Sequence, residues 1–204
     1  MPTLTQMIVP LARFEGDWPG AAWSTAREWR FAAWNGARDP ISPPSTFRLL
    51  RDAAHLYLSA RVGFTALNVD QGRPTTEKSH GLWDHDVVEL FVSPTTSGAP
   101  YVECEASPLG QWLDYRIEEP RVRVDREFQS GMRLRARLEE RAFEIELALP
   151  FTALGGPPVP GARWRANVYV AQGPSHARRH LAWSPTRTPT PDFHVPARFG
   201  WLLF

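Results

Sequence analysis

The chain has 204 residues, of which 43% are hydrophobic and 22% charged, values typical of one soluble globular domain. Twenty prolines and fourteen glycines interrupt the sequence too often for long helices, and nine tryptophans add large flat apolar side chains. The formal net charge of +1 gives no overall attraction to nucleic acid or to an anionic membrane. These values exclude a disordered chain, a fibre and a helical bundle, and they favour short strands joined by turns.

The beginning of the chain carries no pattern of an export signal. Residues 1–10 lack a basic segment followed by an apolar run, and no stretch of the chain reaches membrane-spanning length. We therefore expect a soluble, cytoplasmic monomer with a single domain over residues 1–204. Cys104 is the only cysteine, which excludes an intramolecular disulfide and favours a small apolar strand residue.

Nine segments have the alternation, or the β-branched and aromatic content, of strands bounded by turn residues. These segments are 46–50, 55–62, 86–92, 101–106, 111–117, 132–139, 142–149, 164–171 and 199–204. Such a series predicts an all-β fold, namely an antiparallel two-sheet β-sandwich that is jelly-roll or immunoglobulin-like in outline. Residues 22–35 show no clean period, and we expect a short helical turn or irregular cover there.

The clearest pair of strands lies between residues 132 and 149. Apolar residues alternate with arginines in the first strand and with glutamates in the second. We predict a hairpin that turns near Glu140 and Arg141 and directs its apolar faces to the core. Arginines of one strand then lie opposite glutamates of the other, and each such pair contributes about 0.2–1 kcal/mol.

Residues 83–91 carry the strongest functional signal. A tryptophan, Trp83, and three polar residues lead into an apolar strand that contains one acidic residue, Glu89. A carboxylate in such a strand needs a polar partner or must line a cleft, because its burial alone is costly. An arginine is one such partner, and the hydroxyls of a ligand are another. A pyranose ring presents an apolar C–H face suited to an indole and a rim of hydroxyls suited to a carboxylate.

A second aromatic plate would complete a clamp around such a ring. The C-terminal region offers candidates, including the tryptophans of 180–185 and 199–204. A core role is nevertheless the more common one for any single tryptophan, because an indole buries so much area.

Several segments resemble, in order and spacing, those of family 9 carbohydrate-binding modules and of the wider DOMON-like sandwich group. The matching segments are 46–50, 56–60, WDHDVVELFV at 83–92, 101–110, 143–151, 161–167, 183–185 and 194–200. The resemblance implies a β-sandwich that binds sugar, typically a chain end, between two tryptophans assisted by a carboxylate. At matching positions these are Trp83, Trp183 and Glu89.

The resemblance also implies further polar groups beside the sugar. Family members place amide and arginine groups there, whereas the corresponding region of this chain is Ser-Pro-Leu-Gly-Gln at 107–111. Gln111 is our candidate for the amide, and His180 is a candidate for another polar partner. The family is associated with exported systems of polysaccharide catabolism, so an accessory role beside a glycoside hydrolase is implied.

Paired carboxylates offer a catalytic alternative. Glu103 with Glu105, or Glu144 with Glu146, would project to one face of a strand, as a glycoside hydrolase requires of its acid and nucleophile. A solvated face with arginines nearby explains the same pattern, for example with Arg116 beside the first pair. We therefore expect no enzyme activity.

The sequence also contains candidate ligands for a metal ion or a haem. His176 and His180 have helical spacing but lie where a helix has little room, and a zinc site needs a third ligand. The segment 84–86 is a compact cluster of hard ligands and a candidate for structural calcium, which relatives contain, although no EF-hand pattern is present. Haem, which relatives in the sandwich group bind through a methionine, would use Met132, for which core packing is the simpler role.

The sequence thus predicts a non-catalytic carbohydrate-binding domain with no required cofactor. Binding of nucleic acid is not expected, because the arginines are distributed among acidic neighbours and no basic-aromatic strand signature is present. An interaction scaffold that has lost its ligand stays open as an alternative, because a fold outlives the sites built on it.

Overall fold

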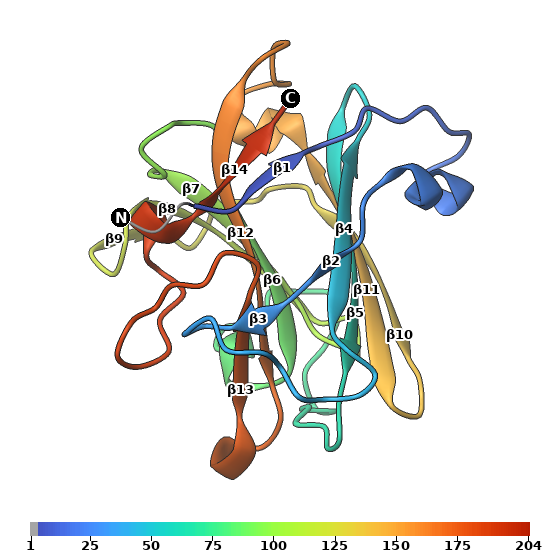
Figure 1. Ribbon diagram of the computed structural model, residues 1–204, viewed down its shortest axis with the longest axis vertical. Coiled ribbons are helices and arrows are strands. Elements are labelled where there is room, and N and C mark those ends of the chain that lie inside the picture. The colour runs from blue at the N-terminus through green and yellow to red at the C-terminus, as the bar shows by residue number, and fades with distance from the viewer. Residues whose placement is uncertain (1–3) are drawn as a thin grey trace.

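A computed structural model describes residues 4–204, in which fourteen strands form two sheets (Figure 1). The larger sheet has nine strands, and β13 and β3 extend it beside β12. In spatial order its main path is β1 (Gln6–Ile8), β14 (Gly200–Leu203), β12 (Arg163–Gln172), β6 (Val87–Ser93), β7 (Tyr101–Ala106), β8 (Trp112–Glu119) and β9 (Arg123–Asp125), with β13 (Arg179–Ala182) and β3 (Ala32–Ala33) to the side.

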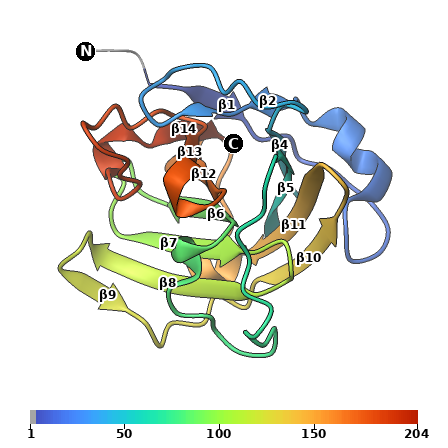
Figure 2. The same ribbon diagram turned by 90° about the horizontal axis from the view of Figure 1, so that it is seen from below.

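The smaller sheet has five strands and covers one face of the larger one. Its order is β10 (Arg133–Leu138), β11 (Ala142–Pro150), β5 (His55–Gly63), β4 (Thr46–Arg51) and β2 (Trp29–Arg30). Figure 2 shows β8 and β9 at one edge of the larger sheet and β10 at the edge of the smaller. Within residues 4–204, short 3-10 helices lie at Gly20–Thr25, Leu82–Asp84, Phe151–Leu154, Ser175–Ala177 and Pro196–Arg198.

The two-sheet β-sandwich is the predicted fold, and all nine predicted segments are strands. Its pairing is antiparallel except that β1 lies parallel to β14. Five strands were not predicted, β1, β2, β3, β9 and β13, because each has only two to four residues and shows too little alternation to be recognised. The unperiodic stretch 22–35 contains the end of a 3-10 turn and two of these short strands.

The main core lies between the sheets and follows from alternation along each strand. Val88 and Leu90 of the larger sheet meet residues such as Leu58 and Ile145 of the smaller one in one buried cluster. Cys104 belongs to this cluster and is fully buried, as expected of a small apolar strand residue.

The predicted hairpin is confirmed as β10 and β11. Arg137 lies opposite Glu144 in the ladder, and the guanidinium nitrogen lies 2.7 Å from the carboxylate oxygen. One detail differs from the prediction, because Leu138 at the end of β10 is exposed rather than in the core. No helix in residues 4–204 is long and apolar enough to cross a membrane.

A second apolar cluster covers the outer face of the larger sheet, the face turned away from the smaller sheet. The sheet contributes large side chains such as Phe91, Tyr101 and Tyr169. Phe193 and Phe199, from the segment before β14, pack over them. This outer face is therefore partly enclosed by the C-terminal segment instead of being open to water, and the enclosure creates a pocket.

Candidate functional site

A pocket of about 380 Å³ opens on this outer face. Side chains from β6, β7 and β8 lie along it, and residues 191–194 form a wall. It is lined by Trp83, Glu89, Glu103, Glu105, Tyr115, Ile117, Arg121, Val124, Arg126, Ala171, His180, Pro191, Asp192, Phe193 and His194. The lining thus combines aromatic surfaces with a concentration of carboxylates.

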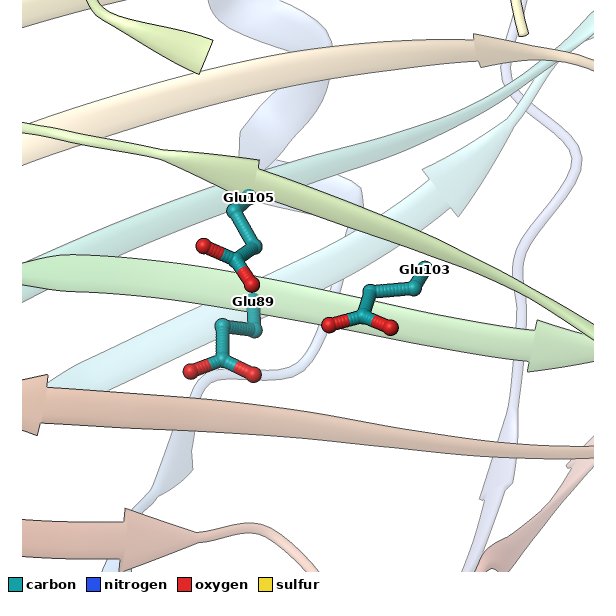
Figure 3. Close-up of side chains that lie close together, drawn as sticks. All are labelled: Glu89, Glu103 and Glu105. Atoms are coloured by element: carbon teal, nitrogen blue, oxygen red, sulfur yellow. The ribbon is translucent and has the colours of Figure 1, made fainter. Parts of the chain in front are cut away.

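Strand register brings three of those carboxylates together. Glu89 of β6 lies directly opposite Glu105 of β7, and Glu103 lies two residues along the same strand. Because the neighbours Leu90 and Cys104 face the core between the sheets, the three glutamates face the pocket. Figure 3 shows the three side chains converging from the two adjacent strands.

The three carboxylates are close together and almost completely buried. One oxygen of each lies within 4.8 Å of the others. Glu89 and Glu103 are each 3% exposed and Glu105 is 0% exposed. Within residues 4–204, none of the three forms an ion pair with an arginine, lysine or histidine. The cluster is therefore an accumulation of negative potential without a side-chain counter-ion in contact.

Burial raises the pKa of all three carboxyl groups, because a buried site disfavours the charged form. It raises the pKa of Glu103 to about 7. For Glu89 and Glu105 the charges of neighbouring glutamates raise the pKa further, and Arg178 opposes this at Glu89. A proton or an added cation is thus needed to offset the charge.

Trp83 stands at the rim of the pocket, where 44% of the residue is exposed. It belongs to the 3-10 turn Leu82–Asp84, just before β6. Arg178 fixes this loop by donating hydrogen bonds of 2.6 Å to the backbone carbonyls of Trp83 and His85 and one of 3.0 Å to that of Gly173. An indole exposed in this way is available to a ligand.

His180 lines the same pocket from β13 and is half-buried. Its ring meets Phe193 edge-on at 5.8 Å, and Phe193 in turn stacks on Tyr169 at 4.2 Å with an interplanar angle of 11°. Burial, and then the nearby Arg178, lowers the pKa of His180, so the ring is neutral at neutral pH. Trp83, Glu89 and His180 are thus the predicted residues that the fold brings to one pocket.

Trp183 does not join them, so the predicted two-tryptophan clamp needs correction. The indole is 4% exposed and belongs to the main core between the sheets. It contacts Trp29 and Phe47 edge-on, with ring centroids 6.1 Å and 6.3 Å away. Trp183 lies in the core because burial of its large aromatic surface between the sheets is favourable.

Gln111 also lies outside the pocket lining. Its side chain accepts a hydrogen bond of 2.8 Å from the Ser107 hydroxyl. Its amide nitrogen donates to the backbone carbonyls of Asp70 and Arg73 at 2.5 Å and 3.2 Å. It therefore holds two loops together where an amide for a ligand was expected.

The solvated-face explanation for Glu103 and Glu105 is wrong. Both are buried in the pocket, and Arg116, the expected partner, instead binds Glu118 with a nitrogen to oxygen distance of 2.7 Å. Spacing correctly placed the two glutamates on one face. Only the register of β7 against β6 could reveal that Glu89 joins them.

The other metal and haem candidates have structural contacts. Asp86 is buried and accepts hydrogen bonds from the backbone nitrogens of Asn68 and Gly173 at 3.1 Å and 2.6 Å. His176 lies in the 3-10 turn Ser175–Ala177, so it does not share a helix with His180. Met132 packs against the main core. In residues 4–204 the one converging group of three potential metal ligands is Glu89, Glu103 and Glu105.

Comparison with known proteins gives one family and several similar structures. A family model described as "Carbohydrate family 9 binding domain-like" matches residues 15–204. The fold is similar to that of a candidate carbohydrate-binding protein from Bacteroides uniformis ATCC 8492, with a TM-score of 0.79 and 20% identity over 99% of this chain and 100% of that one. Curated proteins give no match.

Two further similar structures are of a family 9 carbohydrate-binding module from Caldicellulosiruptor kristjanssonii. The complex with cellotriose has a TM-score of 0.69 and 16% identity, and covers 98% of this chain and 93% of that one. The complex with glucose has a TM-score of 0.65 and 15% identity, and covers 98% of this chain and 95% of that one. These similarities show a shared fold.

Proposed function

The chain belongs to the carbohydrate family 9 binding domain-like family, and from this membership we propose that its pocket binds a sugar without catalysing a reaction. The observation that carries the proposal is the exposed indole of Trp83 at the rim of a pocket whose lining includes three carboxylates. This combination suits a pyranose, which has an apolar face and a polar rim. The pocket volume of about 380 Å³ is within the range of small-molecule sites, about 300–1,000 Å³.

In this proposal Trp83 packs on the C–H face of the ring and Glu89 accepts hydrogen bonds from its hydroxyls. His180, neutral and half-buried, offers a ring nitrogen to a further hydroxyl. Phe193 and His194 also line the pocket, whereas Trp183 does not, so a single tryptophan plate replaces the expected pair. Because stacking on one plate is offset by the desolvation of hydroxyls, we expect modest affinity.

The first test is a glycan array, run with calcium and with a chelator. Glucose and short β-glucans such as cellotriose are the first ligands to include, because the similar module from Caldicellulosiruptor kristjanssonii was solved with them. Binding that is lost in Trp83→Ala, while the melting temperature stays the same, supports the proposal. An array on which the purified wild-type protein binds no glycan would contradict it and favour an interaction scaffold.

The accessory role beside a glycoside hydrolase is part of the same proposal. A binding domain raises the local concentration of a linked enzyme on its polysaccharide. Fusion of this chain to an unrelated hydrolase should then increase release of sugar from a bound polysaccharide, and the fusion carrying Trp83→Ala should not.

A further inference from the structure

Stacking on Trp83 and hydrogen bonding to Glu89 leave two buried glutamates of β7 without a role. Glu105 is fully buried, and within residues 4–204 neither of its carboxylate oxygens accepts a hydrogen bond from a nitrogen or a hydroxyl group. One oxygen of Glu103 is in the same condition. The side-chain hydrogen bond between Glu105 and Glu103 requires a proton on one of the two carboxyl groups. Buried polar atoms are nearly always paired, and an unpaired one costs about 1–3 kcal/mol or more when it is charged. When both carboxyl groups are ionised, these atoms lack a partner that the described residues provide.

The positions of the charged side chains also indicate a missing partner for the glutamates. Glu89 and Glu105 are directly opposite each other in the ladder, where like charges destabilise a sheet. Within residues 4–204, the exposed Arg126 also lines the pocket but forms no ion pair with the three glutamates. Two other arginines near the pocket bind other groups. Arg178 donates to backbone carbonyls, and Arg121 forms an ion pair with Asp192 at 2.5 Å. When the glutamates are ionised, the missing partner is therefore a cation from outside the described residues.

We propose that Glu89, Glu103 and Glu105 hold a calcium ion at the base of the pocket. The three offer only carboxylate oxygens, which are hard ligands and suit calcium or magnesium rather than zinc or copper. One oxygen of each lies within 4.8 Å of the others, so no two of these oxygens are farther apart than two ligands on opposite sides of a calcium ion, with bonds of about 2.4 Å. Magnesium requires a tighter octahedron, at about 2.0–2.1 Å, and keeps more water.

The ion would also define how the pocket selects its ligand, and this step rests on the proposed function. Three carboxylates leave several of the 6–8 positions around calcium to other oxygens. Two neighbouring hydroxyls of a sugar can fill such positions from the open side of the pocket while Trp83 covers the ring. The ligand class is then an uncharged sugar with vicinal hydroxyls, bound in a calcium-dependent way.

Metal binding is tested first, without sugar. Terbium, a trivalent luminescent substitute for calcium, is titrated into chelator-treated protein while tryptophan is excited, since Trp83 lies in the same pocket. Calcium is then measured by titration calorimetry and by the rise in melting temperature that a ligand of the folded state produces. The double variant Glu103→Gln/Glu105→Gln keeps the shape of the side chains, and Glu77→Gln/Glu127→Gln, two exposed positions, matches the loss of charge.

We expect saturable 1:1 binding in the wild type and the control, and at least about a hundredfold weaker binding in the pocket variant, because two of three charged ligands are lost. Equal binding in all three proteins, or none in the wild type, would overturn the calcium site. Circular dichroism shows whether the pocket variant is folded. A chelator should then abolish sugar binding by the wild type. Sugar binding that persists in chelator by a protein that takes up no calcium would overturn the inference and leave the proposed function intact.

Discussion

Replacement of Glu103 by glutamine should stabilise the protein at pH 8 when a chelator removes divalent cations. Burial raises the pKa of Glu103 to about 7, whereas the carboxyl ionises near 4.5 when exposed. Below pH 4.5 the group is protonated in both the folded and the unfolded chain. As the pH rises from about 4.5 through 7, ionisation favours the unfolded chain, and the stability contributed by the protonated form is lost.

The size of the effect follows from the same values. A difference of about 2.5 pKa units, at about 1.4 kcal/mol for each, corresponds to about 3 kcal/mol of unfolding free energy lost by the wild type. Glutamine has no such ionisation. The charge of Glu103 also raises the pKa of Glu89, so its loss lets the pKa of Glu89 fall, which adds to the gain.

Denaturation by urea at pH 4.5 and pH 8, with chelator in both series, measures this difference. The unfolding free energy of Glu103→Gln relative to wild type should rise by about 3 kcal/mol between the two pH values. Glu77→Gln, at an exposed position, should show no such rise. A difference between Glu103→Gln and wild type that is the same at both pH values would refute the buried, protonated carboxyl.

Four further outcomes follow from the placement of individual residues. Trp83→Ala should weaken sugar binding by about tenfold or more with little change in the melting temperature, and Trp83→Phe should retain part of the affinity; calorimetry and thermal unfolding measure both. Trp183→Ala should instead lower the unfolding free energy by about 3–5 kcal/mol, because it empties part of the core. Gly200→Ala should cost about 1–3 kcal/mol in the same denaturation assay, because its Cβ would lie 2.7 Å from the Trp183 ring and 2.8 Å from the Thr5 carbonyl oxygen. Wild type and Glu89→Gln should release equal background amounts of reducing ends from oligosaccharides, and release that depends on Glu89 would show a hydrolase instead.

Alternation and turn residues were enough to predict the sheets of this protein. The longer strands each present one apolar face, and the hairpin of β10 and β11 could be specified to the pairing of its arginines and glutamates. Short strands such as β13 were not predicted. This strand has only four residues, one of them arginine and one histidine, and so few residues do not show an alternation. Tertiary contacts with β12 and β3, which no local pattern contains, make this segment a strand.

The candidate site was predictable only in part. Trp83 and Glu89 could be associated because a polar loop leads directly into an acidic position of an apolar strand. His180 and Trp183 could not both face the pocket, since residues three apart in an extended strand point to opposite sides, and this spacing was the available signal. The burial of Glu103 and Glu105 in the pocket could not be predicted from the sequence. It depends on the register of two strands and on residues 191–194, which form a wall of the pocket.

The three carbonyl contacts of Arg178 have a consequence for the course of binding. They tie the loop of the rim indole to the connection between β12 and β13, so no closing motion is needed to place the ring. Free and ligand-bound forms should superpose closely there, and association should follow a single kinetic phase whose rate rises linearly with ligand concentration. The pocket would then behave as a rigid receptor, with selectivity expressed in how long a ligand stays rather than in how the protein rearranges.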